Sequence, residues 1–161
     1  MYGAGDAKIG SIVNGSSAKG KALKQQFLEA NPNLERVIRE VQQEASTGYL
    51  RGLDGRRISM RRNSEGQVMA HKALNTKLQA AGAVVMKYAT VFLEHWIHKE
   101  GLDAKKVIDM HDEGQYDVNA KDAERLMVLM EKCVKFAGEH LSMNAPLASE
   151  AKFGNSWYDT H

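Results

Sequence analysis

The chain has 161 residues and a mass of 17.9 kDa, the size of one domain that buries roughly 70% of its unfolded surface. Hydrophobic residues make up 43% and charged residues 26%, which excludes compositional disorder, and the longest apolar run, 80–86, is too short to span a bilayer. The formal charge of +2 does not by itself indicate a nucleic-acid partner. Residues 1–10 carry no secretory signal and Cys133 has no possible internal disulfide partner, so we expect a cytoplasmic protein.

The first third of the chain is predicted to be helical. Residues 18–30 place Leu23 and Phe27 on one face, Asn31 ends this helix, and Pro32 opens a second helix that runs to about residue 45. From residue 49 to 60 the pattern changes to two short extended pieces around an Asp54-Gly55 turn. We therefore expect a helical hairpin followed by a small basic β-hairpin.

The rest of the chain alternates long helices with two strands. A polar loop at 63–68 precedes a long helix over about 69–99, which Gly101 is expected to end. Its apolar stripe steps by three and four residues through Leu74, Leu78, Ala81, Val85, Tyr88, Phe92 and Trp96. Strands are predicted at 106–110 and 114–118, then a helix at about 121–141 and an irregular tail. The predicted class is α+β.

An acidic segment, His111-Asp112-Glu113, connects the two predicted strands. Carboxylates held on a rigid hairpin suit Mg²⁺, which prefers oxygen ligands and keeps water or phosphate in its remaining positions. An ordinary solvated turn remains the alternative, because a two-metal site needs carboxylates from more than one segment. No second segment stands out as a donor.

Polar and basic side chains also form two patterns that suit DNA. His71, Asn75 and Gln79 recur every four residues on the long helix, where hydrogen-bond donors would match minor-groove acceptors; a solvated helix face is the alternative. Arginines that suit phosphate contacts, or solubility alone, cluster around the Asp54-Gly55 turn: Arg51, Arg56, Arg57, Arg61 and Arg62. Tyr2, followed by Gly3-Ala4-Gly5, suits stacking on a base, or is a frayed end.

In this order, these segments resemble the C-terminal part of family A DNA polymerases, most closely those of short-tailed phages. Tyr2-Gly3-Ala4-Gly5-Asp6 is similar to the end of the fingers helix, and Leu53-Asp54-Gly55-Arg56 to the Leu-Asp-Gly-Arg hairpin. Residues 71–79 resemble the duplex-contacting palm helix and 111–113 the metal-binding palm hairpin. The ending, Gly154-Asn155-Ser156-Trp157 to His161, is also similar, so the resemblance covers nearly the whole chain.

The resemblance implies a fold and a set of roles. Residues 1–48 would be the distal, helical part of the fingers, and 49–161 the C-terminal part of the palm, with long helices on a small antiparallel sheet. Asp112 would bind the catalytic Mg²⁺ ions with support from Glu113, and His111 would lie near the primer terminus. The implied DNA contacts are Tyr2 beside the templating base, His71, Asn75 and Gln79 in the minor groove, and Arg56 and Arg57 on the backbone.

The sequence also departs from the family pattern. A second metal-binding aspartate, the earlier part of the fingers helix and the thumb are not found in these 161 residues, and Gly114 replaces the usual aliphatic residue. We therefore expect a split or truncated DNA-directed DNA polymerase that acts on primer-template DNA and deoxynucleoside triphosphates, in a bacterial or phage-infected cytoplasm, only with a complementary N-terminal fragment. The rival hypothesis is a noncatalytic DNA-binding or interaction module.

Overall fold

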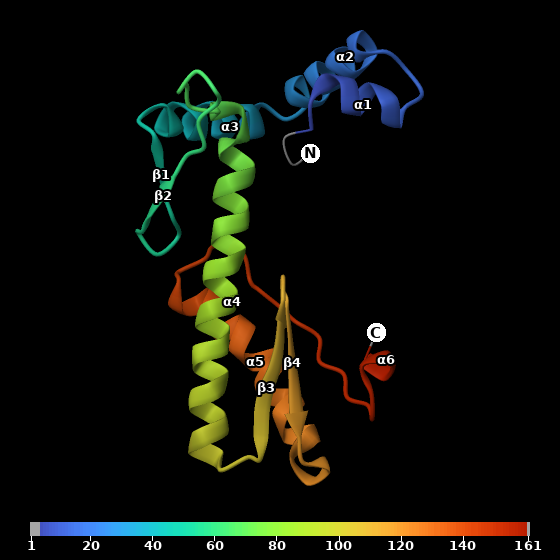
Figure 1. The fold of residues 1–161 in the computed structure, drawn as a ribbon, viewed down its shortest axis with the longest axis vertical. Coiled ribbons are helices and arrows are strands. Elements are labelled where there is room, and N and C mark those ends of the chain that lie inside the picture. Colours follow the sequence, from blue (N-terminus) through green and yellow to red (C-terminus); the bar gives the residue numbers. More distant parts are fainter. Residues whose placement is uncertain (1–3, 161) are drawn as a thin grey trace. The chain divides into compact units, whose positions relative to one another are not determined.

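Two antiparallel hairpins and the helices around them make up the computed structural model, which describes residues 4–160 (Figure 1). The strands are β1 (Tyr49–Arg51), β2 (Arg57–Ser59), β3 (Ala104–Met110) and β4 (Glu113–Val118). The helices are α1 (Asp6–Ile12), α2 (Ser17–Glu29), α3 (Pro32–Ser46), α4 (Ala73–Glu100), α5 (Ala123–His140) and α6 (Trp157–Thr160), with 3-10 turns at Ala70–Lys72 and Ala120–Asp122. The predicted α+β class is confirmed.

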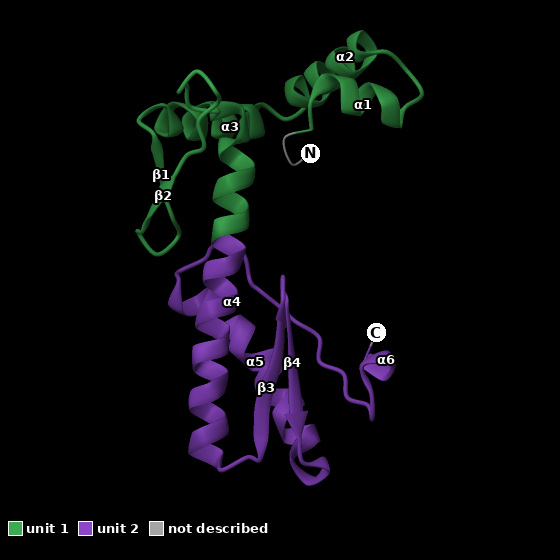
Figure 2. Ribbon diagram, viewed as in Figure 1, with its two compact units in different colours: residues 1–80 green, residues 81–161 purple. Residues whose placement is uncertain are grey.

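The chain divides into two compact units, residues 1–80 and 81–161 (Figure 2). The long helix α4 begins in the first unit and continues into the second. The predicted boundary between fingers and palm, after residue 48, comes from the resemblance to the polymerase family and not from compactness, so it stays a prediction. None of the described helices has the length and apolar character needed to cross a membrane.

The first unit has its core around the β1–β2 hairpin. Leu50 is fully buried between α3 and the start of α4, where it packs with Val41, Ala45, Met60 and Ala73. Strands β1 and β2 pair antiparallel, and Gly55 adopts a φ of +83°, which glycine accepts without a Cβ clash. The predicted basic hairpin, with its Asp-Gly turn, is confirmed.

Helices α1 and α2 pack through glycine at their closest approach. A Cβ built on Gly20 would lie 2.0 Å from the carbonyl oxygen of Asp6 and 2.6 Å from the backbone nitrogen of Gly10. Helix α1 was not predicted, because its seven residues are too few to show a period. The predicted apolar face of α2 is only partly covered, since Leu23 and Phe27 are 37% and 41% exposed.

The second unit covers one face of the β3–β4 hairpin with α4 and α5. Ala104, Tyr116 and Val118 on the hairpin pack against a core formed by the two helices. That core consists of Val85, Ala89, Leu93 and Ile97 from α4, and Leu126, Leu129, Cys133 and Ala137 from α5. The side chains of β3 and β4 on the other face lie outside this core.

The observed core corrects the predicted apolar stripe of the long helix. Leu78 is 49% exposed rather than buried. Leu93 and Ile97, which the predicted stripe omitted, are buried, whereas Phe92 and Trp96 lie beside the core, where Phe92 makes an edge contact with Phe136. The aromatic residues therefore form the margin of the core.

Alanine substitutions at two helical glycines distinguish the effect of close packing on stability from the effect of helix propensity. We expect Gly20→Ala to lower the free energy of unfolding by about 2 kcal/mol or more, because its Cβ has no space beside α1. Gly82→Ala in α4 is the matched control, since no atom lies within 4 Å of its Cβ position and alanine favours the helix by about 0.5–1 kcal/mol. Urea denaturation of both variants measures this difference. A Gly20→Ala variant as stable as the parent would contradict the observed α1–α2 contact.

Candidate functional site

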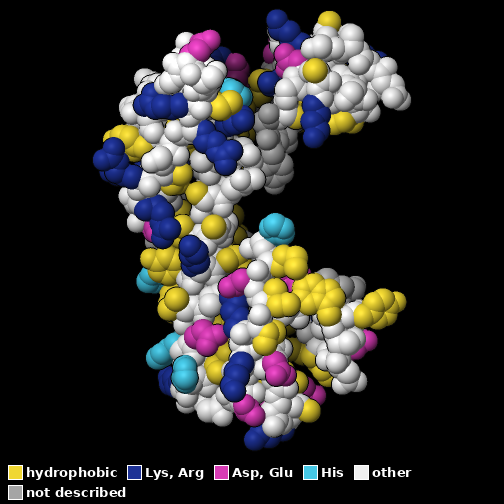
Figure 3. Space-filling model, in the orientation of Figure 1, with side chains coloured by type: hydrophobic (Ala, Val, Ile, Leu, Met, Phe, Trp, Pro, Cys, Tyr) yellow, Lys and Arg dark blue, Asp and Glu magenta, His cyan; other side chains and the backbone are white. Residues whose placement is uncertain are grey.

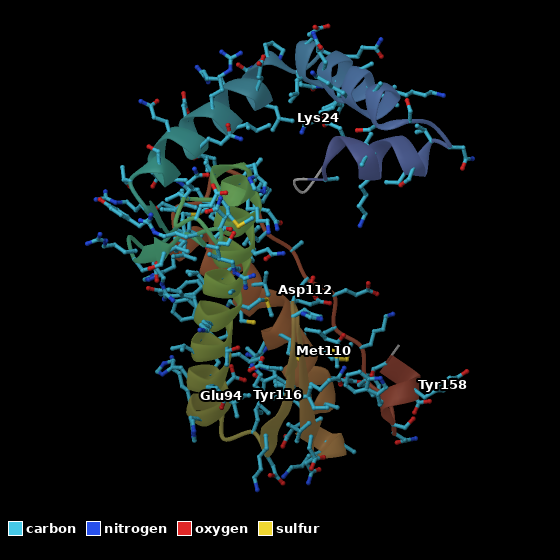
Figure 4. The ribbon with its side chains drawn as sticks, turned by 45° about the horizontal axis from the view of Figure 1, so that its top comes forward. Lys24, Glu94, Met110, Asp112, Tyr116 and Tyr158 are labelled. Atoms are coloured by element: carbon cyan, nitrogen blue, oxygen red, sulfur yellow. The ribbon has the colours of Figure 1, made fainter. Side chains whose placement is uncertain are left out.

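The acidic segment forms the tip of the β3–β4 hairpin. Met110 pairs with Glu113, so the turn itself consists of His111 and Asp112, and Glu113 belongs to β4 rather than to the predicted connection. His111 adopts a φ of +53°, a left-handed conformation that histidine tolerates better than most residues. His111 and Asp112 are exposed, and Asp112 lies at the end of the hairpin in Figure 4. We call residues 111–113 the acidic turn.

The hairpin below the acidic turn is anchored to the helices. Tyr116 on β4 lies beside Glu94 of α4 (Figure 4), and burial together with the Glu94 carboxylate raises the pKa of Tyr116 well above its usual value. Burial also raises the pKa of Cys133 to about 11, which keeps this side chain a neutral thiol. Cys133 lies in the core formed by α4 and α5, and Tyr116 packs against it, so both side chains contribute to the packing of the hairpin.

The acidic turn provides oxygen ligands from one segment. Glu113 accepts a hydrogen bond from the Gln115 amide, and no described residue pairs with the side chain of Asp112. Within residues 4–160, no three histidine, cysteine or acidic side chains come together in a metal-binding group. The chemistry of the two carboxylates suits Mg²⁺, but it fills only part of an octahedral coordination sphere.

In the first unit, the two predicted phosphate-binding arginines already have partners. The Arg56 guanidinium pairs with Asp54 through Nε and Nη2, at 2.8 and 2.6 Å from Oδ2, and this contact lowers the pKa of Asp54. Arg57 lies 4.0 Å over the Tyr49 ring. Both side chains are on the exposed surface of the basic hairpin, where Lys and Arg side chains gather in Figure 3. Their contact with DNA stays a prediction.

The predicted polar stripe spans two elements. His71 lies in the 3-10 turn before α4, while Asn75 and Gln79 lie on α4. The Asn75 Oδ1 atom is buried without a hydrogen-bond partner among the described residues. The contact of this stripe with the minor groove stays a prediction. Tyr2 lies outside the described residues.

A residue that sequence reasoning missed links the basic hairpin to α4. Glu44 of α3 accepts hydrogen bonds from Lys77 Nζ and from the backbone nitrogen of Arg51, both at 2.6 Å. These contacts lower the pKa of Glu44, and the hydrogen bond from Lys77 contributes most to this shift. Lys77 and Glu44 are 33 residues apart, so no local pattern in the sequence indicates the pair.

The C-terminal tail lines a cavity of about 560 Å³ in the second unit, which the sequence did not predict. Its walls come from both strands of the β3–β4 hairpin, from α5 and from residues 150–157 of the tail. Val107, Ile108 and Met110 of β3 are 59%, 39% and 45% exposed, and Phe153 and Trp157 of the tail are also exposed. An apolar surface therefore lies on the side of the hairpin that the helices leave uncovered.

Comparison with known proteins gives one consistent result. The profile of DNA polymerase family A matches residues 1–159. A DNA-directed DNA polymerase of Escherichia phage Phieco32 is 54% identical over 160 residues, which cover 99% of this chain and 26% of the relative. The DNA-directed DNA polymerase of Escherichia phage T7 is 30% identical over 183 residues, which cover all of this chain and 25% of the relative. The chain thus spans about a quarter of the length of these relatives.

A solved structure shows the same fold. The chain is similar to the POL domain of Pol1 from M. smegmatis, solved in complex with DNA primer-template and dNTP. The TM-score is 0.74 at 22% identity, over 84% of this chain and 25% of the other. The arrangement of helices and hairpins described above is therefore the arrangement of part of a polymerase domain.

The Glu44 contacts predict a pH-dependent contribution to stability. Because the pKa of Glu44 is below its usual 4.5 in the folded state, its stabilisation is present above that pH and is lost as the pH falls through the folded-state pKa. We expect Glu44→Gln to lower the free energy of unfolding by about 0.5–1 kcal/mol at neutral pH, and by less near pH 3. Glu40→Gln is the control, since its contact with Arg36 is a long 3.9 Å. Equal effects of both variants at all pH values would contradict the assignment.

The backbone of His111 predicts which residues the turn accepts. Asparagine tolerates positive φ, whereas a β-branched residue does not. We expect His111→Asn to keep the stability of the parent and His111→Val to lose about 1–2 kcal/mol. Denaturant unfolding of the two variants measures the difference, and equal stability would show that the turn does not hold this conformation.

Proposed function

We propose a function for this chain from one premise: it belongs to DNA polymerase family A. The chain would supply the distal fingers and the C-terminal palm to a polymerase that catalyses template-directed nucleotidyl transfer. The observation that carries the proposal is the acidic turn, where an unpaired Asp112 projects from a hairpin anchored to α4 and α5. The substrates would be primer-template DNA and deoxynucleoside triphosphates.

Asp112 and Glu113 would hold Mg²⁺ in this reaction. Their carboxylates are hard oxygen ligands on a supported turn, which fits the requirements of the ion. When bound, Mg²⁺ would neutralise charge on the triphosphate and the leaving group. The residues of the chain orient these oxygens through the β3–β4 register, and the exposed His111 lies beside them, where it would contact the primer terminus.

The first unit would hold the duplex. Hydrogen-bond donors at His71, Asn75 and Gln79 would match the acceptors that every correct base pair presents in the minor groove. Arg56 and Arg57 on the basic hairpin would contact the sugar-phosphate backbone without reading sequence, and Tyr2 would stack beside the templating base. Glu44 would keep the hairpin and the helix in register, because it binds Arg51 and Lys77 at once.

The groups that complete the metal site would come from a complementary N-terminal polymerase segment outside these 161 residues. Two observations support this partner: the acidic turn supplies ligands from one segment only, and β3 exposes Val107, Ile108 and Met110, of which the first two line a large cavity. Apolar side chains next to an open strand edge suit pairing with another polypeptide. Cytoplasmic localisation in a bacterium or infected host remains part of the proposal.

Primer extension tests the proposed activity. The chain is mixed with the complementary N-terminal part of the phage Phieco32 polymerase, because the C-terminal part of that polymerase is 54% identical to this chain. A primed template is then supplied with dNTPs and Mg²⁺. Neither part alone is expected to extend the primer, whereas the mixture should. We expect Asp112→Asn to lower the rate of the mixture on the order of a hundredfold or more. Glu124→Gln, which removes an exposed carboxylate on α5, should leave the rate within about twofold.

Two results would contradict this proposal. Extension by the chain alone, lost in Asp112→Asn, would show that no outside ligand is needed. A stable mixture that binds duplex DNA in a salt-dependent way but never extends the primer would favour the noncatalytic DNA-binding module.

A further inference from the structure

Lys106 is a largely buried lysine on β3, in the second unit. Its side chain is 16% exposed, which is unusual for lysine unless its charge is paired. The ammonium donates a hydrogen bond to Thr90 Oγ1 of α4 at 2.9 Å and forms an ion pair with Asp109 on its own strand. These two contacts fix the position of a positive charge.

A β-bulge directs Lys106 toward the tip of the hairpin. Lys106 is opposite Tyr116 and Asp109 is opposite Gly114, while Val107 between them has no partner in the ladder. Residues directly opposite each other share one face of a sheet, so the extra residue places Lys106 and Asp109 on the same face, toward α4. In a regular strand, residues three apart would lie on opposite faces.

The end of the lysine lies next to the acidic turn. A Cβ built on Gly114 would be 3.5 Å from Lys106 Cε and 4.0 Å from its Nζ, so the lysine occupies the space over this glycine. Lys106 also lines a cavity of about 120 Å³ together with Asp112 and Glu113. The Lys106 ammonium therefore lies beside the carboxylates that the proposed function assigns to metal binding.

We propose that Lys106 is a positioning residue of the acidic turn, whose fixed positive charge sets how tightly Asp112 and Glu113 hold a divalent cation. The inference rests on the proposed function, because it takes these carboxylates as metal ligands. The ammonium competes electrostatically with a lone metal ion at the turn. A metal ion that arrives with triphosphate oxygens brings negative charge, so Lys106 opposes it less. The residue thereby favours the metal-nucleotide complex over the free ion.

Mn²⁺ binding to the 161-residue chain, followed by the electron paramagnetic resonance signal of the free ion, tests this inference. Lys106→Met removes the charge and keeps the length of the side chain; it should tighten Mn²⁺ binding about three- to tenfold. Lys106→Arg should bind like the parent. Lys105→Met is the control, since it removes the same charge from an exposed position on the other face of β3, and should change the affinity less than twofold. Circular dichroism monitors folding of each variant.

A second variant covers the case in which Lys106→Met does not fold. Thr90→Val keeps the charge but removes the hydrogen bond that fixes it, and should tighten Mn²⁺ binding by a smaller factor than Lys106→Met. Asp112→Asn in each background identifies the binding that belongs to the turn. If this Asp112-dependent binding exists but neither Lys106→Met nor Thr90→Val tightens it, the inference is wrong and the proposed function stands. If no variant shows Asp112-dependent binding, either in the chain alone or after addition of the complementary N-terminal part of the phage Phieco32 polymerase, both are wrong.

Discussion

The candidate active site depends on the way α4 and α5 cover one face of the β3–β4 hairpin. Two strands alone have too little buried surface to hold a fixed shape in water. Here Ala104, Tyr116 and Val118 pack against the helices, and Tyr116 and Lys106 add polar contacts to Glu94 and Thr90. The turn that carries Asp112 extends from this anchored base, so its carboxylate is held without having a partner of its own.

The same arrangement leaves the other face of the hairpin available. The helix-covered face is complete, whereas Val107, Ile108 and Met110 remain exposed beside a large cavity. Apolar side chains at an open strand edge are commonly covered by another polypeptide segment. Under the proposed function, the occupant of this surface would be the remaining part of a polymerase.

Local signals in the sequence predicted much of the fold. Pro32, the Asp54-Gly55 turn and Gly101 each mark a boundary that the structure contains, and helical periodicity located α2 to α5 within a few residues. Short elements such as α1 and α6 were missed, because a few residues show no period. For the site, the motif around Asp112 was recognised from its order in the chain, and its metal-binding role stays a prediction.

The contacts that support the site were beyond sequence reasoning for a physical reason. Glu44 and Lys77, Lys106 and Thr90, and Gly20 and Asp6 meet only after the chain has folded, and their partners lie 14 to 33 residues away. The bulge at Val107, which reverses the direction of later β3 side chains, has no signature in residue type. Such features are read from tertiary structure alone.

Hydrogen–deuterium exchange on residues 104–118 tests the central claim most directly, namely that the uncovered face and edge of the hairpin receive the rest of a polymerase. The amides of this segment are followed in the chain alone and after addition of the complementary N-terminal part of the phage Phieco32 polymerase. The account predicts slower exchange in β3 or β4 after the addition. Helix α3, in the first unit, serves as the internal reference. Unchanged exchange throughout residues 104–118 in a mixture that forms a stable complex would contradict it.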